Sequence, residues 1–438
     1  METILQIGEG NFLRAFAEIY IQEAVDNGYG GRVVICQPRN NTRVINALKK
    51  QGSEYDVIVR GRLNGEIINE RKHINCVSRA IDTYGEYGEI RKLFCSADLR
   101  IVISNTTEAG ICFDGSDKRE NAPDVTFPAK LTCLLYERFM ENGTGLVFLP
   151  VELIENNGDA LRDCIIRYAR LWKLGEEFIA YVENDCSFCN TLVDRIVTGH
   201  IADDSDPCSS ACEPYRSWII QANESAKAVI PFENVTFTED LVPYRTRKVR
   251  ILNGTHTMSV LAAHMAGFDI VRDMMNDELF GKYIQLGLEE IKSTINLPKR
   301  ELDDFADSVL ERFNNPFIDH KLLDISLNSV SKFKARCLDT IIDYSHSNNA
   351  LPKVLTFSLA ALIAFYLKLG NRKYEVKDNK EVLDFFAEKP SVREILSNES
   401  FWDIDLTEIS GLLETVERRV ENIRKNGIVR AVEEVVNE

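Results

Sequence analysis

The first 150 residues alternate between short apolar runs and longer stretches in which apolar side chains recur every three or four positions. The short runs predict β-strands, and they cover residues 4–7, 32–37, 99–104 and 145–149. The longer stretches predict helices over residues 12–25 and 130–140. Strands that alternate with helices are typical of an α/β fold with a parallel, doubly wound sheet.

A hairpin interrupts this alternation at Asn64-Gly65. Asn-Gly is the dipeptide that a two-residue hairpin turn prefers, because both positions need positive φ angles. It is flanked by β-rich runs at residues 56–59 and 66–69. We therefore expect two antiparallel strands joined by this turn.

The pattern changes after about residue 250, where helical periodicity dominates and strand candidates nearly vanish. The stretch at 354–367 is almost uncharged, but at about 14 residues it is too short to span a bilayer, so we expect a buried core helix. The sequence predicts an α/β domain over residues 1–246 and an all-α domain over residues 247–438. The other expected helices cover residues 258–266, 278–295, 302–312, 322–342, 380–386 and 409–425.

The composition of the chain limits the classes of molecule that we expect it to bind. The chain has 438 residues, and 52 Lys and Arg against 68 Asp and Glu give it a net charge of −16. This balance argues against binding to nucleic acid or to an anionic membrane surface. The first residues lack a basic segment followed by an apolar one, and the eleven cysteines read as reduced thiols. We expect a cytoplasmic protein.

A glycine-rich turn follows the first expected strand and opens the first expected helix. Two glycines allow a tight turn and a close approach of backbone to a pyrophosphate, and the helix N-terminus offers free N–H groups to that anion. The third glycine of the usual fingerprint is replaced by Leu13, so a glycine turn of some other α/β protein is the alternative. The candidate cofactor-binding residues here are Ile7, Gly8, Glu9, Gly10, Asn11, Phe12, Leu13, Arg14 and Ala15.

Two further strand ends add candidates for the same cofactor. The second strand ends at Gln37, where an acidic residue would bind the ribose of NAD, and Arg39 and Arg43 lie close by. This spacing leaves NAD and NADP open. After the strand at 99–104 come Asn105 and Thr106, small polar residues at the edge where doubly wound folds place ligands, although a simple polar loop is equally consistent.

The segment from Lys248 to His256 is the most informative for chemistry. We expect Lys248 on an extended segment, Asn253 as the N-cap of a helix, and His256 in the first turn, where the helix dipole favours a neutral imidazole. Lysine, amide and neutral histidine together can interconvert a carbonyl and an alcohol without a metal. Neighbouring arginines would lower the pKa of the lysine. The alternative is a basic, solvated edge beside a capped helix.

Other polar groups are candidates for substrate contacts. Asp194 could instead form a structural ion pair with Arg195, and the group around Pro316 could instead mark a helix end. The candidates are Asp194, Arg312, Asn315, His320 and Lys332. Cys186, Cys189, Cys208 and Cys212 have spacing that would suit zinc, but we expect buried or loop thiols and no catalytic metal.

Together these segments resemble the polyol-specific long-chain dehydrogenase/reductase family, which includes mannitol dehydrogenase. The resemblance rests on residues 8–14, on Val193-Asp194-Arg195-Ile196, and on Lys248-x4-Asn253-x2-His256. A narrower resemblance, to members that act on sugar acids, rests on residues 6–16, 104–111, 190–199, 247–257 and 312–316.

The resemblance implies a Rossmann domain that binds NAD, a helical C-terminal domain and hydride transfer to a small sugar acid. It implies that Lys248 is the acid/base, that Asn253 contacts the oxyanion and that His256 orients the substrate. The family's Asp-Asn pair after the strand at 145–149 is absent, and Glu152 and Asn157 follow instead. Alternatives are a sister activity on another uronate or a polyol, a non-catalytic NAD-binding protein, and a zinc-dependent dehydrogenase.

Overall fold

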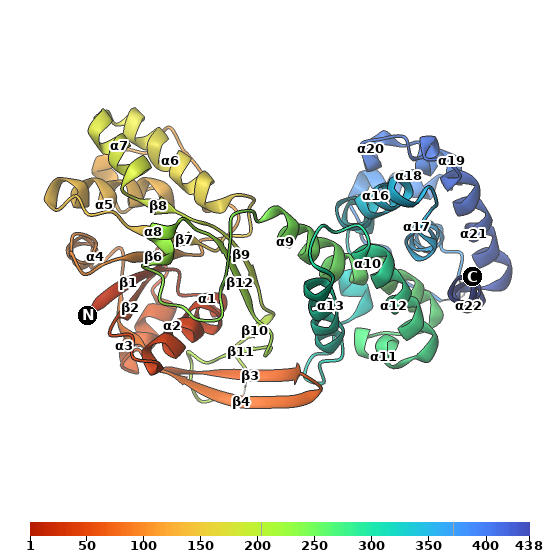
Figure 1. Cartoon of the computed structure of the whole chain (residues 1–438), viewed down its shortest axis with the longest axis horizontal. Coiled ribbons are helices and arrows are strands. Elements are labelled where there is room, and N and C mark those ends of the chain that lie inside the picture. Colours follow the sequence, from red (N-terminus) through yellow and green to blue (C-terminus); the bar gives the residue numbers. More distant parts are fainter. Residues whose placement is uncertain (203, 371) are drawn as a thin grey trace. The chain divides into compact units, whose positions relative to one another are not determined.

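The computed structural model describes residues 1–202, 204–370 and 372–438 and divides into two compact units. Figure 1 labels the elements in chain order. The first unit comprises Met1–Arg60 and Ile67–Leu241, and the second comprises Gly61–Glu66 and Val242–Glu438.

A six-stranded parallel sheet organises the first unit, in the order β5-β2-β1-β6-β7-β8. In the central strand, Leu5 pairs with Val34 on one side and with Val102 on the other. In chain order these strands follow the 3-2-1-4-5-6 arrangement of a Rossmann fold, which confirms the predicted fold class. The strands are β1 Glu2–Ile7, β2 Arg32–Cys36, β5 Val77–Ile81, β6 Ile101–Ser104, β7 Val147–Pro150 and β8 Ser187–Phe188.

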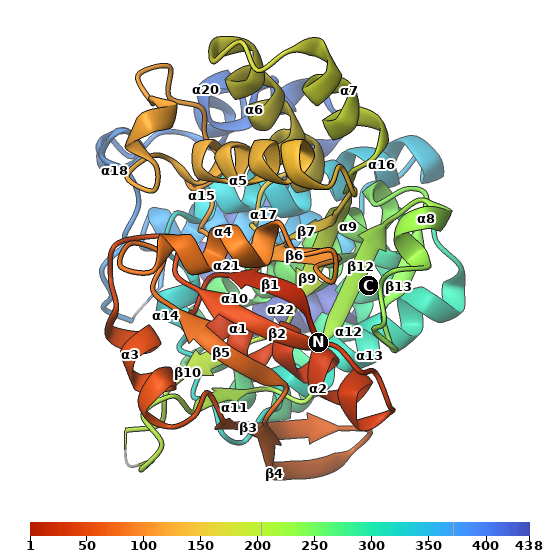
Figure 2. The same ribbon diagram turned by 90° about the vertical axis from the view of Figure 1, so that its left-hand side faces the viewer.

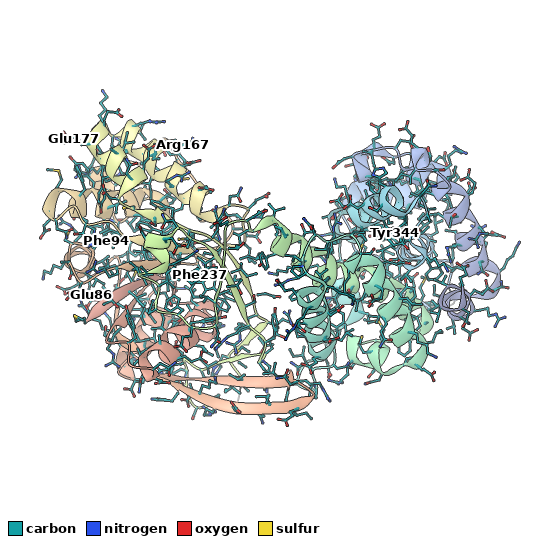
Figure 3. The ribbon with its side chains drawn as sticks, viewed as in Figure 1. Glu86, Phe94, Arg167, Glu177, Phe237 and Tyr344 are labelled. Atoms are coloured by element: carbon teal, nitrogen blue, oxygen red, sulfur yellow. The ribbon has the colours of Figure 1, made fainter. Side chains whose placement is uncertain are left out.

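Helices cover both faces of this sheet (Figure 2). One face packs on α1 Asn11–Ala15, α2 Ala17–Asp26 and α3 Arg43–Lys50. The other packs on α4 Tyr87–Phe94, α5 Phe127–Glu141, α6 Asn157–Leu171 and α7 Glu176–Asn184. Phe94, labelled in Figure 3, is fully buried in this second core.

The helix expected over residues 12–25 is interrupted at Phe16, so that prediction was wrong in one respect. Phe16 leaves helical geometry with φ −125° and ψ −74°, and its N–H donates to the carbonyl of Leu13 at 3.0 Å. Its ring packs against the rings of Tyr20 and Trp218. This aromatic packing holds α1 as a separate short turn.

Two smaller sheets complete the first unit. The first has the order β10-β11-β3-β4 and contains the predicted hairpin, with Asn64 and Gly65 at φ 51° and 81°. The hairpin tip belongs to the second unit, where the backbone N–H groups of Asn64 and Gly65 donate to Glu311 at 2.9 and 2.6 Å. The second sheet has the order β13-β12-β9. The elements are β3 Tyr55–Leu63, β4 Glu66–Ile74, η1 Arg119–Asn121, β9 Asn190–Asp194, β10 Val197–Gly199, β11 Ser210–Cys212, β12 Ser217–Gln221, α8 Glu224–Lys227 and β13 Thr236–Thr238.

The second unit is helical and is built around α17, Lys353–Tyr366. Every residue of α17 after Lys353 is buried, which confirms the predicted core helix. The unit also contains α9 Val242–Arg247, the π-helical segment η2 Lys248–Asn253, α10 Gly254–Ala266, α11 Val271–Asn276, α12 Glu278–Lys292 and α13 Lys299–Phe313. Its last elements are α18 Lys380–Ala387, α19 Val392–Leu396, α20 Glu399–Trp402, η4 Leu406–Glu408, α21 Leu412–Asn426 and α22 Ile428–Asn437.

The single helix expected over residues 322–342 is instead a broken series. The first piece ends at Ile325, and Asn328, which adopts a left-handed conformation with φ 55°, precedes the second. A second π-helical segment then lies between two α-helices. The series is α14 Leu322–Ile325, α15 Ser329–Phe333, η3 Lys334–Leu338 and α16 Asp339–Asn348, which carries the Tyr344 labelled in Figure 3.

Candidate functional site

The glycine turn of the first unit is closed on one side and open on the other. Gly8 has φ 133°, and a Cβ atom there would lie 2.9 Å from the carbonyl oxygen of Asn105, so only glycine fits. At Gly10, by contrast, a Cβ atom would meet no atom of the described residues within 4 Å. Gly10 also precedes the first N–H groups of α1. This open side is the cradle that a pyrophosphate needs.

Arg14 supports the turn from inside the protein. Its buried guanidinium donates to the carbonyl of Glu9, to Oδ1 of Asn11 at 2.7 Å and to the carbonyl of Cys208 at 3.2 Å. The side chains of Ile7, Leu13 and Ala15 are also buried, and that of Phe12 is half-buried. These residues therefore shape the turn, while the exposed Asn11 and half-buried Glu9 lie nearer its surface.

An acidic group that was not predicted lies beside the end of β2. Gln37 is buried, and its Nε2 donates to Oδ1 of Asp82 at 2.6 Å, while its Oε1 accepts from the N–H of Thr83 at 3.1 Å. Asp82 directly follows β5, the neighbouring strand, and hydrogen bonds lower its pKa. A strand at residues 77–81 followed by an aspartate was the available signal. A carboxylate from the residue after β5 thus lies beside the end of β2.

The loop after β6 is held by a buried carboxylate. Glu152 accepts from the N–H and Oγ1 of Thr106 at 2.9 and 3.0 Å and from Oγ of Ser104 at 3.1 Å. Burial raises the pKa of Glu152. Asn105, whose N–H donates to the carbonyl of Ile7, lies between these contacts, against the glycine turn.

The side chain of Asn157 forms hydrogen bonds with the backbone around it. Its amide nitrogen donates to the carbonyls of Pro150, Glu152 and Thr191 at 3.0 to 3.2 Å. Its Oδ1 accepts from the N–H of Thr191 at 2.8 Å. Asn157 is therefore a structural residue at the start of α6.

The helix around Lys248 differs from the expected geometry. The expectations of an extended segment and of an Asn253 cap were wrong, because α9, η2 and α10 form one continuous helix and Asn253 makes no capping hydrogen bond. In η2 the hydrogen bonds link residues five apart, so Lys248 and Asn253 lie about one turn from each other. An α-helix would separate them by about 140°. The π-helical segment therefore explains the spacing of Lys248 and Asn253.

His256 follows Asn253 by three residues, which places it on the same side of α10. Its ring stacks on Phe313 and meets the edge of His320 at 5.2 Å between centroids. The pKa of His256 lies well below its usual value, first because of burial and then because of electrostatic repulsion by His320, Arg312, Arg336 and Lys332. The expected neutral imidazole is retained, but not through a helix dipole, since no helix begins there.

Two of the arginines near Lys248 each have a carboxylate close by that offsets their charge. Arg250 pairs with Asp343 at 2.6 Å, and Arg247 lies 3.8 Å from Glu301. These carboxylates offset part of the arginine charge, and the expected lowering of the lysine pKa stays a prediction.

The predicted substrate contacts fall in both units. Asp194 is buried at the end of β9 in the first unit. Arg195, its neighbour, donates to the carbonyls of Glu213 and Ala15 at 2.9 and 2.7 Å. In the second unit, Arg312 and Asn315 are buried, and His320 and Lys332 are half-buried near His256. Arg336 was not among the predicted residues, but it also lies near His256.

The cysteines are dispersed. Burial raises the pKa of each of the four thiols with zinc-like spacing, to about 11 for Cys186 and Cys212 and about 12 for Cys189. Over residues 1–202, 204–370 and 372–438, no three His, Cys, Asp or Glu side chains gather in a way that could hold a metal ion. None of the described helices combines the length and apolar composition that crossing a bilayer requires.

Comparisons with known proteins agree with this arrangement. The mannitol dehydrogenase Rossmann domain model matches residues 2–233, and the mannitol dehydrogenase C-terminal domain model matches residues 240–424. The altronate oxidoreductase of Escherichia coli O7:K1 is 40% identical over 98% of this chain and 96% of its own length. That of Halalkalibacterium halodurans is 36% identical over 100% of this chain and 94% of its own length.

Two solved structures share the fold. The mannitol 2-dehydrogenase of Pseudomonas fluorescens, solved with NAD and D-mannitol, has a TM-score of 0.69 at 20% identity, over 100% of this chain and 94% of that one. A substrate-free D-sorbitol dehydrogenase has a TM-score of 0.84 at 18% identity, over 98% of this chain and 94% of that one.

Proposed function

Because the chain belongs to the mannitol dehydrogenase family, we propose that it reversibly reduces D-tagaturonate to D-altronate with NADH. It is an oxidoreductase acting on CH–OH groups. The observation that supports this choice of substrate is the 40% identity to an altronate oxidoreductase across nearly the whole of both chains. The reaction belongs to hexuronate catabolism.

The glycine turn fits a dinucleotide, because Gly8 keeps the turn tight and Gly10 leaves room for a diphosphate. When bound, the reduced dinucleotide supplies the hydride. The carboxylate of Asp82 beside Gln37 supports NAD rather than NADP, because a carboxylate accepts a hydrogen bond from a ribose hydroxyl and repels a 2′-phosphate. Thr106, held by Glu152, and Asn105, bonded to the carbonyl of Ile7, lie at the end of β6.

Lys248 is the proposed acid/base. In the reductive direction its ammonium group protonates the oxygen of the former ketone, and in the oxidative direction the neutral amine removes the alcohol proton. Asn253 lies on the same side of the helix, where its amide can donate to that oxygen as negative charge develops. His256 Nε2 has no hydrogen-bond partner among the described residues, which leaves it available to orient a substrate hydroxyl.

The test is a panel of kcat/KM values, each measured with NADH and with NADPH. The substrates are D-tagaturonate, D-fructuronate, D-fructose and fructose 6-phosphate, the last two being the ketoses of mannitol and mannitol phosphate. We expect the highest value for D-tagaturonate with NADH. Equal or better values for a neutral ketose would overturn the uronate assignment. Binding of NADH without oxidation across the panel would instead support a non-catalytic protein, and loss of turnover on chelation would support the zinc alternative.

A further inference from the structure

Arg336 is a half-buried cation that has no acidic partner in the described part of the second unit. Its Nη1 donates to Oγ1 of Thr257 at 3.3 Å, a neutral group. Burial lowers its pKa, and no carboxylate counters that effect. Other arginines of the unit are compensated by carboxylates: Arg250 by Asp343, Arg272 by Asp319, Arg372 by Asp269 and Arg419 by Glu438.

A second cation lies one helical turn before Arg336. Nζ of Lys332 donates to the carbonyl of Ile325 at 2.9 Å, again a neutral group. Burial lowers the pKa of Lys332, and the charge of Arg336 lowers it further, although Asp378 acts in the opposite sense. Holding two like charges together in a partly buried place is costly, and a bound anion would relieve that cost.

The π-helical segment η3 brings Arg336 to the helix that carries the proposed catalytic residues. A Cβ atom on Gly254 would lie 3.1 Å from the carbonyl oxygen of Arg336, and Sγ of Cys337 donates to the carbonyl of Gly254 at 3.7 Å. Thr257, which accepts the hydrogen bond from Arg336, directly follows His256. The two π-helical segments thus pack against each other, and the cation pair lies beside the imidazole.

We propose that Arg336, assisted by Lys332, binds the carboxylate of the sugar acid and so selects it over neutral ketoses. The planar guanidinium offers two parallel N–H donors that match a carboxylate, whereas a lysine offers only a point charge. This inference rests on the proposed function and adds the residues that distinguish an acid from a polyol. Arg336 is assigned to substrate binding, and the proton transfer stays with Lys248.

The experiment compares Arg336→Gln and Arg336→Lys with the wild type on two substrates, D-tagaturonate and D-tagatose. D-Tagatose carries a hydroxymethyl group in place of the carboxylate and retains the ketone. Removing one partner of a buried charge pair costs at least about 2 kcal/mol, which corresponds to roughly a 30-fold effect. We expect Arg336→Gln to lower kcat/KM for D-tagaturonate at least 30-fold, mainly through KM, while kcat/KM for D-tagatose changes less than about threefold.

Lys334→Gln is the matched control, because Lys334 lies on the same π-helical segment but pairs with Asp403 at 3.0 Å. We expect it to leave both substrates unaffected, and Arg336→Lys to be intermediate on the acid alone. Equal losses on both substrates with Arg336→Gln would show a structural role and overturn the inference, as would no loss on either. A wild-type enzyme that prefers neutral ketoses would overturn the proposed function as well. An acid-selective wild type whose selectivity survives Arg336→Gln would overturn this inference alone.

Discussion

The imidazole of His256 lies flat on the ring of Phe313, with 3.9 Å between centroids and 10° between planes. This stacking fixes the plane of the imidazole, and the edge contact with His320 limits its rotation. Nε2 is left without a partner in the described residues, so the ring presents a fixed polar atom. A ring held in this way suits the orienting role that we propose for His256, and that role requires a neutral imidazole.

We expect His256 to be uncharged at pH 6.5, where an ordinary histidine is half protonated. Burial and four neighbouring cationic or titratable groups lower its pKa well below 6.5, so protonation requires a more acidic solution. The measurement is the pH dependence of the imidazole ¹⁵N shifts, with His256→Asn used to assign the signal among the six histidines. A midpoint near 6.5 for this signal would contradict the arrangement.

Replacing Lys248 with Ala tests the proton transfer. General acid–base groups contribute about 10²- to 10⁴-fold, so we expect kcat for D-tagaturonate reduction to fall by at least 100-fold. Lys334→Ala removes a lysine from the same unit and should leave kcat unchanged. If Lys248→Ala retained kcat within about tenfold, the acid/base would have to be another group.

Gly8→Ala and Gly10→Ala should separate folding from cofactor binding. Ala at Gly8 would need φ 133° and would overlap the carbonyl of Asn105, so we expect a loss of more than about 1 kcal/mol in the free energy of unfolding. Ala at Gly10 is compatible with φ −68° and meets no described atom, so stability should be kept. Its methyl group would occupy the diphosphate cradle, and we expect Kd for NADH to rise about tenfold or more.

Denaturant unfolding and NADH titration of the two variants give both quantities. Unchanged NADH affinity in a stable Gly10→Ala protein would place the dinucleotide elsewhere.

Glu18 should make stability depend on pH. It is fully buried, Nε2 of Gln6 donates to its Oε1 at 2.7 Å, and burial raises its pKa to about 7. Between about pH 4.5 and 7 the native state keeps a proton that the unfolded chain loses, so the free energy of unfolding falls as pH rises through this range. Over the whole range the loss is at most about 3.5 kcal/mol.

Glu18→Gln carries no titratable proton, so the stability difference between variant and wild type should shift in favour of the variant from pH 5 to pH 8. Other groups titrate in both proteins and cancel in this difference. A constant difference across that range would show that Glu18 is ionised throughout.

The parts of this fold that the sequence predicts are those set by local patterns. The glycine turn at Gly8 and Gly10, the hairpin at Asn64-Gly65 and the apolar helix α17 each carry their signal within a few residues. The break at Phe16 depends on packing against Trp218, about 200 residues away in the sequence, and could not be predicted locally.

The candidate site shows the same limit. The spacing of Lys248, Asn253 and His256 pointed to the segment that we propose to be catalytic. The extended conformation predicted for Lys248 was wrong, because a π-helical segment has no simple periodic signal in the sequence. Asp82 and Arg336 were not predicted, because each is linked to the candidate site only by a contact with another element. Asp82 accepts a hydrogen bond from Gln37, and Arg336 donates one to Thr257.

The continuity of the helix from Val242 to Ala266 has a mechanical consequence. One continuous helix carries Lys248, Asn253 and His256, so a rigid displacement of that helix would move all three together. As the proposed proton donor, Lys248 could not approach a substrate while Asn253 and His256 stay behind. The backbone itself would then keep the proposed acid/base, the amide and the imidazole in one fixed arrangement.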